Sequence, residues 1–167
     1  MGSIEGRIGG VFAGNDIHAL VEDGKVEGRI GGAIIGDDIN IEYSMIDGTI
    51  KGRFGGVVFG KDIAGSIGND FVDARIGGGI DGHDLKLKQD GNTVYGRCGG
   101  IVDGFDVLIN FQGSIATDRL GGTFDGFDVE CQCIDVEPIV SAVVIASAYY
   151  LYKKKQNHSS SGGGANN

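Results

Sequence analysis

The sequence has few cysteines, few basic residues and no apolar run as long as the roughly 20 residues that cross a bilayer. It has three cysteines, Cys98, Cys131 and Cys133, and shows no secretory signal. An odd number of cysteines without such a signal favours free thiols in a reducing, cytoplasmic compartment. Cys131 and Cys133 are expected to face the same side of a strand as small apolar residues. With 14 Lys and Arg against 23 Asp and Glu, the net charge of −9 repels nucleic acid.

Histidine is also scarce, since the chain has only three, and no nucleophile motif or metal-ligand spacing accompanies them. We therefore expect no catalytic residues, no metal and no cofactor. The Asp-rich turns lack the spacing of a calcium-binding loop.

Glycine is abundant, with 33 residues, and it recurs within a sequence motif that occurs six times. The motif consists of Arg, an apolar residue, Gly-Gly, three mostly apolar residues, Gly, a variable residue and Asp. Glycine is not every third residue, which excludes collagen, and no helical pattern follows any copy, which excludes a phosphate-binding loop. The Arg positions are Arg7, Arg29, Arg53, Arg75, Arg97 and Arg119, and the Asp positions are Asp16, Asp38, Asp62, Asp84, Asp106 and Asp128.

Each repeat predicts two antiparallel strands. Turn signals such as Asp23-Gly24 separate the copies, and runs such as Ile39, Ile41 and Tyr43 alternate with polar residues. The glycine pair predicts a bend between the strand that carries the Arg and the strand that carries the Asp. The Arg and Asp sets are expected on the polar face, paired with each other and with turn carbonyls, in a structural role.

The composition changes after the last repeat. Residues 139–152 are apolar all round, which predicts a helix buried in protein or in lipid. The segment is short of the roughly 20 residues that a bilayer needs, but its tyrosines and Lys153–Lys155 resemble an interface belt, so membrane association stays open. We expect one domain over residues 1–152 and a basic, then Ser/Gly-rich disordered tail over 153–167.

Two architectures accommodate these elements. In the first, six two-stranded repeats form a closed, mainly β barrel of about twelve antiparallel strands, and the 139–152 helix fills the wide interior. In the second, the repeats stack as a β-solenoid and the helix is an end cap or an anchor.

The last strand and helix, residues 127–131 through 138–146, resemble those of the tubby C-terminal domain, the phospholipid scramblases and the plant LURP-one proteins. The resemblance implies a twelve-stranded barrel around a hydrophobic helix over residues 4–152. Tubby domains bind phosphoinositides through basic residues, and no corresponding cluster occurs here, so the resemblance implies the fold and not the site.

Two functions follow as expectations. The first is a non-enzymatic intracellular binding or scaffold domain of the tubby or scramblase type, acting at a membrane surface, with lipid or protein as partner. The second is a structural glycine-rich repeat protein anchored to a membrane by its helix. Departures from the repeat are the first places to search for a site, namely His18, His83, Phe105 and Phe127, with His83 expected as an exposed turn residue.

Overall fold

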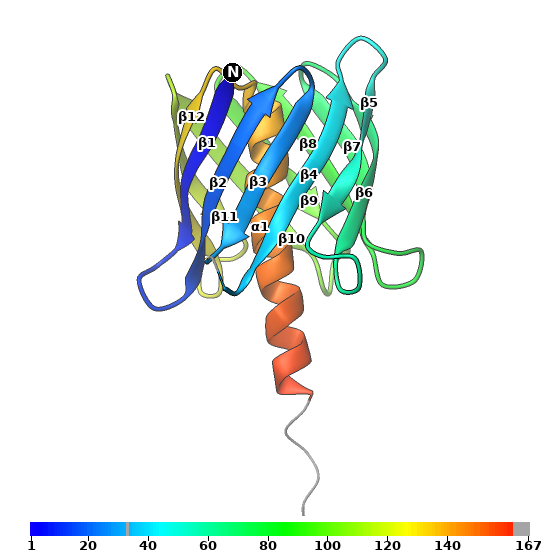
Figure 1. Cartoon of the computed structure of the whole chain (residues 1–167). Helices are drawn as coiled ribbons and strands as arrows, with labels where there is room; N and C mark the ends of the chain where they lie inside the picture. Colours follow the sequence, from blue (N-terminus) through cyan, green and yellow to red (C-terminus); the bar gives the residue numbers. More distant parts are fainter. Residues whose placement is uncertain (33, 162–167) are drawn as a thin grey trace, which may run out of the picture.

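Twelve antiparallel strands close into a barrel around one C-terminal helix (Figure 1). The computed structural model describes residues 1–32 and 34–161. Every strand pairs with its neighbours along the chain, and β1 pairs with β12 to close the ring. The predicted barrel is confirmed, and the solenoid is wrong, because stacked repeats would leave the first and last strands apart. The strands are β1 Gly2–Gly9, β2 Gly14–Glu22, β3 Lys25–Gly31, β4 Gly36–Ser44, β5 Thr49–Phe54, β6 Lys61–Ile67, β7 Phe71–Ile76, β8 His83–Asp90, β9 Thr93–Cys98, β10 Phe105–Gln112, β11 Ile115–Leu120 and β12 Phe127–Ile134.

The strands alternate between an apolar inner face and a polar outer face. In β4, for example, Ile39 and Ile41 are buried while Asn40 and Glu42 are exposed. Inward-facing residues from all twelve strands form one core with the helix. The expected half-buried strands with a period of two are therefore present, and the core lies inside the barrel.

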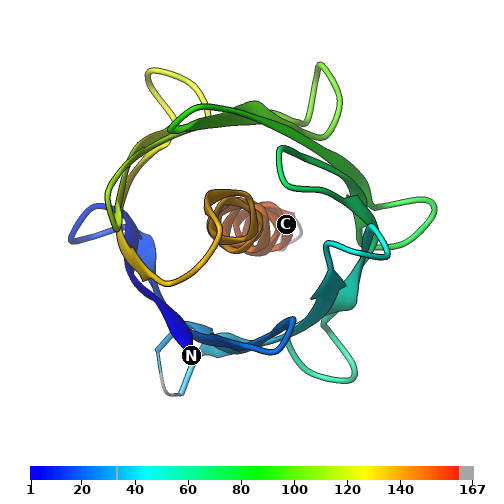
Figure 2. The same cartoon turned by 90° about the horizontal axis from the view of Figure 1, so that it is seen from above.

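Helix α1, Pro138–Ser160, runs along the middle of the barrel (Figure 2). Pro138 suits the first turn, where its missing N–H would have no helical partner. Every residue from 139 to 151 is buried against the surrounding strands. The small residues Ser141, Ala146 and Ser147 are fully buried and let the barrel wall approach the helix closely.

The helix is longer than the sequence analysis predicted. We expected it over 139–152 with a disordered tail from residue 153, and this is wrong over 153–160, which is helical. The stretch from 153 to 161 contains no Gly or Pro, and its lysines bind groups at the barrel mouth. The rest of the predicted tail, 162–167, lies outside the described residues. Within the described chain no helix is long and apolar enough to cross a membrane.

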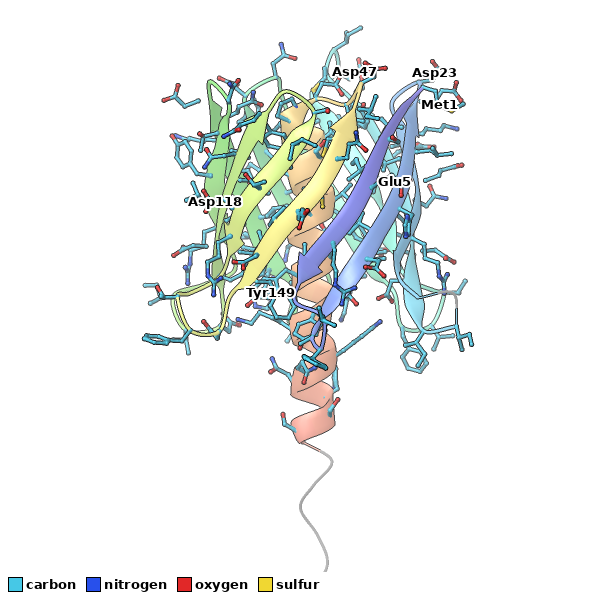
Figure 3. The ribbon with its side chains drawn as sticks, turned by 90° about the vertical axis from the view of Figure 1, so that its left-hand side faces the viewer. Met1, Glu5, Asp23, Asp47, Asp118 and Tyr149 are labelled. Atoms are coloured by element: carbon cyan, nitrogen blue, oxygen red, sulfur yellow. The ribbon has the colours of Figure 1, made fainter. Side chains whose placement is uncertain are left out.

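The two ends of the barrel differ. One end carries the short turns between repeats, marked by Asp23 and Asp47 in Figure 3, together with the link into α1. The other end carries the six glycine loops, and Tyr149 of α1 lies at this level (Figure 3). We call this end the glycine rim; it consists of residues 9–14, 31–36 without residue 33, 55–60, 77–82, 99–104 and 121–126.

Candidate functional site at the glycine rim

Each loop of the glycine rim is fastened by the Arg and Asp of its own repeat. The Arg Nη1 donates a hydrogen bond to the Asp Oδ1 nine residues later, at 2.5–2.7 Å in five repeats, and Arg29 pairs with Asp38 in the same way. The Arg Nε donates to the carbonyl of the second glycine of the pair, at 3.0–3.2 Å in all six repeats. The twelve residues that the repeat singled out thus hold six equivalent loops in place.

The first glycine of each pair sets the direction of its loop. Its φ angle lies between 83° and 91° in all six repeats, a left-handed conformation that side chains other than glycine rarely adopt. Some guanidinium groups reach further into the loop. Arg53 Nη2 donates to the Val57 carbonyl at 3.0 Å, and Arg119 Nη2 donates to the Thr123 carbonyl at 3.0 Å. The loops are therefore held by hydrogen bonds from within, although their tips contact little else.

The tips of these loops are apolar and stand in solvent. The three residues after each glycine pair are mostly apolar in the sequence, but we did not predict that they would be exposed. The sequence pattern could have indicated exposed loops, because these residues lie between glycines and do not alternate with polar residues as in a strand. The large apolar side chains there have relative exposures of 79–104 %; they are Val11, Phe12, Ile34, Ile35, Val57, Val58, Phe59, Ile80, Ile101, Val102 and Phe124.

The rim has two different halves. The last three loops each carry a carboxylate beside their apolar tip, at Asp81, Asp103 and Asp125. The first three carry none between the glycine pair and the third glycine. We call the tips of the first three loops the apolar half-rim; they are Val11, Phe12, Ile34, Ile35, Val57, Val58 and Phe59.

The polar end of α1 is tied to the rim. Lys155 Nζ lies 2.6 Å from Asp37 Oδ2, and Lys154 Nζ donates to the Asp81 carbonyl at 3.1 Å. Lys153 Nζ lies 5.8 Å from the ring centroids of both Phe105 and Tyr149, within the range of a cation–π contact. These contacts place three ammonium groups around the point where the helix leaves the barrel.

The structure corrects the expectation for His83. It begins β8 and is only 9 % exposed, so it is not an exposed turn residue. Its Nε2 lies 2.8 Å from Asp103 Oδ2, and this hydrogen bond lowers the pKa of the Asp103 carboxyl. Its ring packs edge-on against Tyr150, with centroids 5.4 Å apart. The repeat has a variable residue at this position, and the contact with α1 explains why a large side chain is buried there.

The His83 cluster lacks a nucleophile. A cavity of about 60 Å³ lies beside His83, Asp103 and Tyr150. Cys98, the cysteine of the neighbouring strand, is fully buried, and burial raises the pKa of its thiol to about 12, so it stays protonated. Among the described residues that line this cavity there is no Ser, Thr or Cys that could act as an activated nucleophile in covalent catalysis.

The other departures from the repeat have structural surroundings. His18 is exposed on the outer wall and contacts Glu5. Phe105 and Phe127 pack on Tyr149, with ring centroids 4.7 and 5.2 Å apart, and help to close the barrel around the helix. Cys131 and Cys133 are free and buried on the inner face of β12, as expected. Among the described residues no three His, Cys, Asp or Glu side chains come together as a metal site.

Comparison of the chain with protein-family models, with curated proteins and with solved structures finds no match in any of the three. The barrel around a hydrophobic helix is present, as the resemblance to tubby and scramblase proteins implied, but no relative supports that family.

Proposed function

We propose that this chain is a non-enzymatic binding domain that docks on lipid surfaces through the apolar half-rim. The observation that carries the proposal is the set of seven apolar side chains, at least 79 % exposed, on three consecutive loops. Large exposed apolar patches mark interaction sites, because they gain free energy only when a partner covers them. The arginine-fastened loops hold these side chains outward and prevent them from folding back onto the barrel.

The arrangement of the tips favours lipid over a protein partner. The loops of the rim flare outward from the barrel as separate fingers (Figure 2). A rigid protein partner would need a matching pocket for each finger, whereas the fluid boundary between headgroups and acyl chains adapts to each one. Apolar side chains of peripheral proteins enter this boundary to a depth of about 5–10 Å.

The unequal halves of the rim define how the barrel would meet the surface. The polar end of α1 projects beyond the loops (Figure 1), so flat contact would push it into lipid. Tilting the barrel onto the apolar half-rim lifts the helix end and keeps Asp81, Asp103 and Asp125 in water. Lys61, Lys154 and Lys155 line one cavity beside Phe59; the first and last face carboxylates, and Lys154 would attract anionic headgroups.

This proposal includes a kinship with the tubby, scramblase and LURP-one barrels, supported by architecture alone, and a cytoplasmic location, supported by the free thiols. An anchor role for α1 has less support, because residues 139–151 are buried inside the barrel.

The test is co-sedimentation of the full chain with phosphatidylcholine vesicles, with and without phosphatidylserine. The triple variant Phe12→Ser, Ile35→Ser, Phe59→Ser should lose at least tenfold in binding, since full burial of each side chain contributes about 1.5–3 kcal/mol and 1.4 kcal/mol is tenfold.

The matched control substitutes three equally exposed tips of the other half, Ile80→Ser, Ile101→Ser and Phe124→Ser, and should bind like the wild type. The proposal fails if the wild-type chain stays in the supernatant with both vesicle types, or if the two triple variants lose binding equally.

A further inference from the structure

A cavity of about 270 Å³ opens at the apolar half-rim, between the β5–β6 loop and the end of α1. Two kinds of side chain line it. Val58, Phe59 and Leu151 form its apolar wall, and the polar side chains are Asp37, Lys61, Lys154, Lys155 and His158. The residues that matter for ligand binding are Val58, Phe59, Leu151, Lys61, Lys154 and Lys155.

The cavity has an excess of positive charge. Lys61 Nζ lies 2.9 Å from Asp81 Oδ2, and Lys155 Nζ lies 2.6 Å from Asp37 Oδ2, so each of these ammonium groups faces a carboxylate. Lys154 is different. Its Nζ contacts the Asp81 carbonyl at 3.1 Å and the Tyr150 ring at 5.5 Å, and no carboxylate of the described residues lies within ion-pair distance of it.

The polar and apolar parts are arranged for an amphiphile. Leu151 is buried and forms the inner part of the apolar wall, whereas Phe59 stands at the exposed tip of the loop. A chain that followed this wall outward from Lys154 would leave the cavity at the tips that we place against lipid. One ammonium in excess matches one negative charge on a headgroup.

We propose that this cavity binds a long-chain carboxylate, with its headgroup on Lys154 and its alkyl chain along Leu151 and Phe59. The inference deepens the proposed function and rests on it, since the same half-rim would bring the protein to the surface from which such a ligand partitions. Val58 lines the cavity from the loop side, and Asp81 and Asp37 neutralise Lys61 and Lys155, so that Lys154 supplies the charge for the headgroup.

The test is isothermal titration of the full chain with dodecanoate below its micelle concentration. We expect saturable binding of one dodecanoate per chain. Acetate, which lacks the chain, and dodecyltrimethylammonium, which carries the opposite charge, should not bind. Dodecyl phosphate shares the anionic head and the chain, and binding that is tenfold tighter than that of dodecanoate would overturn the carboxylate assignment.

Two pairs of variants locate the site. Lys154→Met should weaken dodecanoate binding at least tenfold, whereas Lys153→Met, the neighbouring lysine outside the cavity, should leave it unchanged. Phe59→Ser should weaken it, whereas Phe12→Ser, on another loop, should not. Equal effects within either pair would overturn the site.

The two proposals fail separately. Phe12→Ser should reduce vesicle binding while it leaves dodecanoate binding intact. Vesicle binding by a wild-type chain that does not bind dodecanoate would overturn the cavity and leave the lipid-surface proposal standing. Dodecanoate binding without vesicle binding would overturn the proposed function and leave the cavity.

Discussion

The arginine of each repeat binds two acceptors at once, which a lysine in the same position cannot do. Arg53 uses Nη1 for Asp62 and Nε for the Gly56 carbonyl, so one planar group bridges a carboxylate and a turn. Arg53→Lys keeps the charge but can retain the ion pair only, and we expect the loop to open while the barrel stays folded. Hydrogen exchange of the amides at residues 56–60 should quicken, with the other five loops as internal controls. Unchanged exchange would show that the guanidinium does not fasten the loop.

Some glycines of the repeat allow close approach of two strands, and others lie in open space at the loops. One pair of variants distinguishes the two groups. A Cβ on Gly52 would stand 2.3 Å from the Asn40 carbonyl oxygen of the neighbouring strand, whereas a Cβ on Gly56 would meet nothing within 4 Å. Gly52→Ala should therefore destabilise the barrel by about 1–3 kcal/mol, as overpacking does, because backbone has to move. Gly56→Ala should stay within about 0.5 kcal/mol of the wild type. Urea unfolding of both variants measures the difference, and equal stabilities would contradict the close approach.

The sixth repeat has no glycine at the position equivalent to Gly52, directly before the arginine. Asp118 stands where four repeats have glycine, and it has a φ angle of 105°. This conformation turns the side chain outward, where Asp118 Oδ2 accepts a hydrogen bond from Asn110 Nδ2 at 2.6 Å. The sequence alone could not predict this, because an aspartate at an inward position of a strand normally signals an error in register.

Acid should weaken the contact between the start of β6, at Lys61, and the β7–β8 loop, at Asp81. The hydrogen bond from Lys61 lowers the pKa of Asp81 below its ordinary value of about 3.9. The pair therefore contributes stability above that ordinary value, and the contribution is lost as the pH falls through the lower pKa of the folded state. Asp81→Asn should be slightly less stable than the wild type at pH 7, and the two should converge as the pH falls below the lowered pKa of Asp81. A gap that persists in acid would show that the carboxylate charge is not its cause.

At the scale of elements, the helix is the part of the core that no strand can replace. It contributes an unbroken run of buried residues from 139 to 151. A chain that ends at Asp135 loses all of them, each large one stabilising by about 1.5–3 kcal/mol, against a typical total stability of 5–15 kcal/mol. We expect that chain to aggregate or stay unfolded, by circular dichroism and gel filtration, whereas a chain that ends at Tyr152 should fold. Cooperative folding of the shorter chain would show that the barrel stands without its helix.

Element boundaries were predictable where composition changes sharply and not elsewhere. Pro138 and the apolar run placed the start of α1 within one residue. Its end was missed by eight residues, since Lys153–Lys155 read as a solvated tail in the sequence. In the structure they meet Phe105, Asp81 and Asp37, which lie far away along the chain. Contacts of this kind arise only when the barrel brings the loops around the helix.

At the scale of the whole molecule, the sequence established the repeat but not its closure. A period of 22 or 24 residues suits a solenoid and a ring equally well, because both bury the same alternating face. The pairing of Ile4 with Cys133 and of Ile8 with Val129 decides between them. For the same reason the apolar tips could be identified as a set but not placed on one rim: antiparallel order brings all six loops to one edge of the sheet, and closure bends that edge into a ring.

Closure around a helix makes the number of repeats obligatory. Barrel diameter grows roughly linearly with strand number, and α1 fills the ring of twelve, so we expect a ring of ten strands to be too narrow for its side chains. Deletion of residues 93–114 removes β9 and β10, joins β8 to β11 and preserves the antiparallel order of the rest. A solenoid would tolerate such a deletion because each repeat contacts only its neighbours. We expect the deleted chain to be insoluble or unfolded at a temperature where the wild type unfolds in a single calorimetric transition. A soluble monomer that unfolds cooperatively would mean that the wall can close without the helix inside, and α1 would then have to be placed outside the ring.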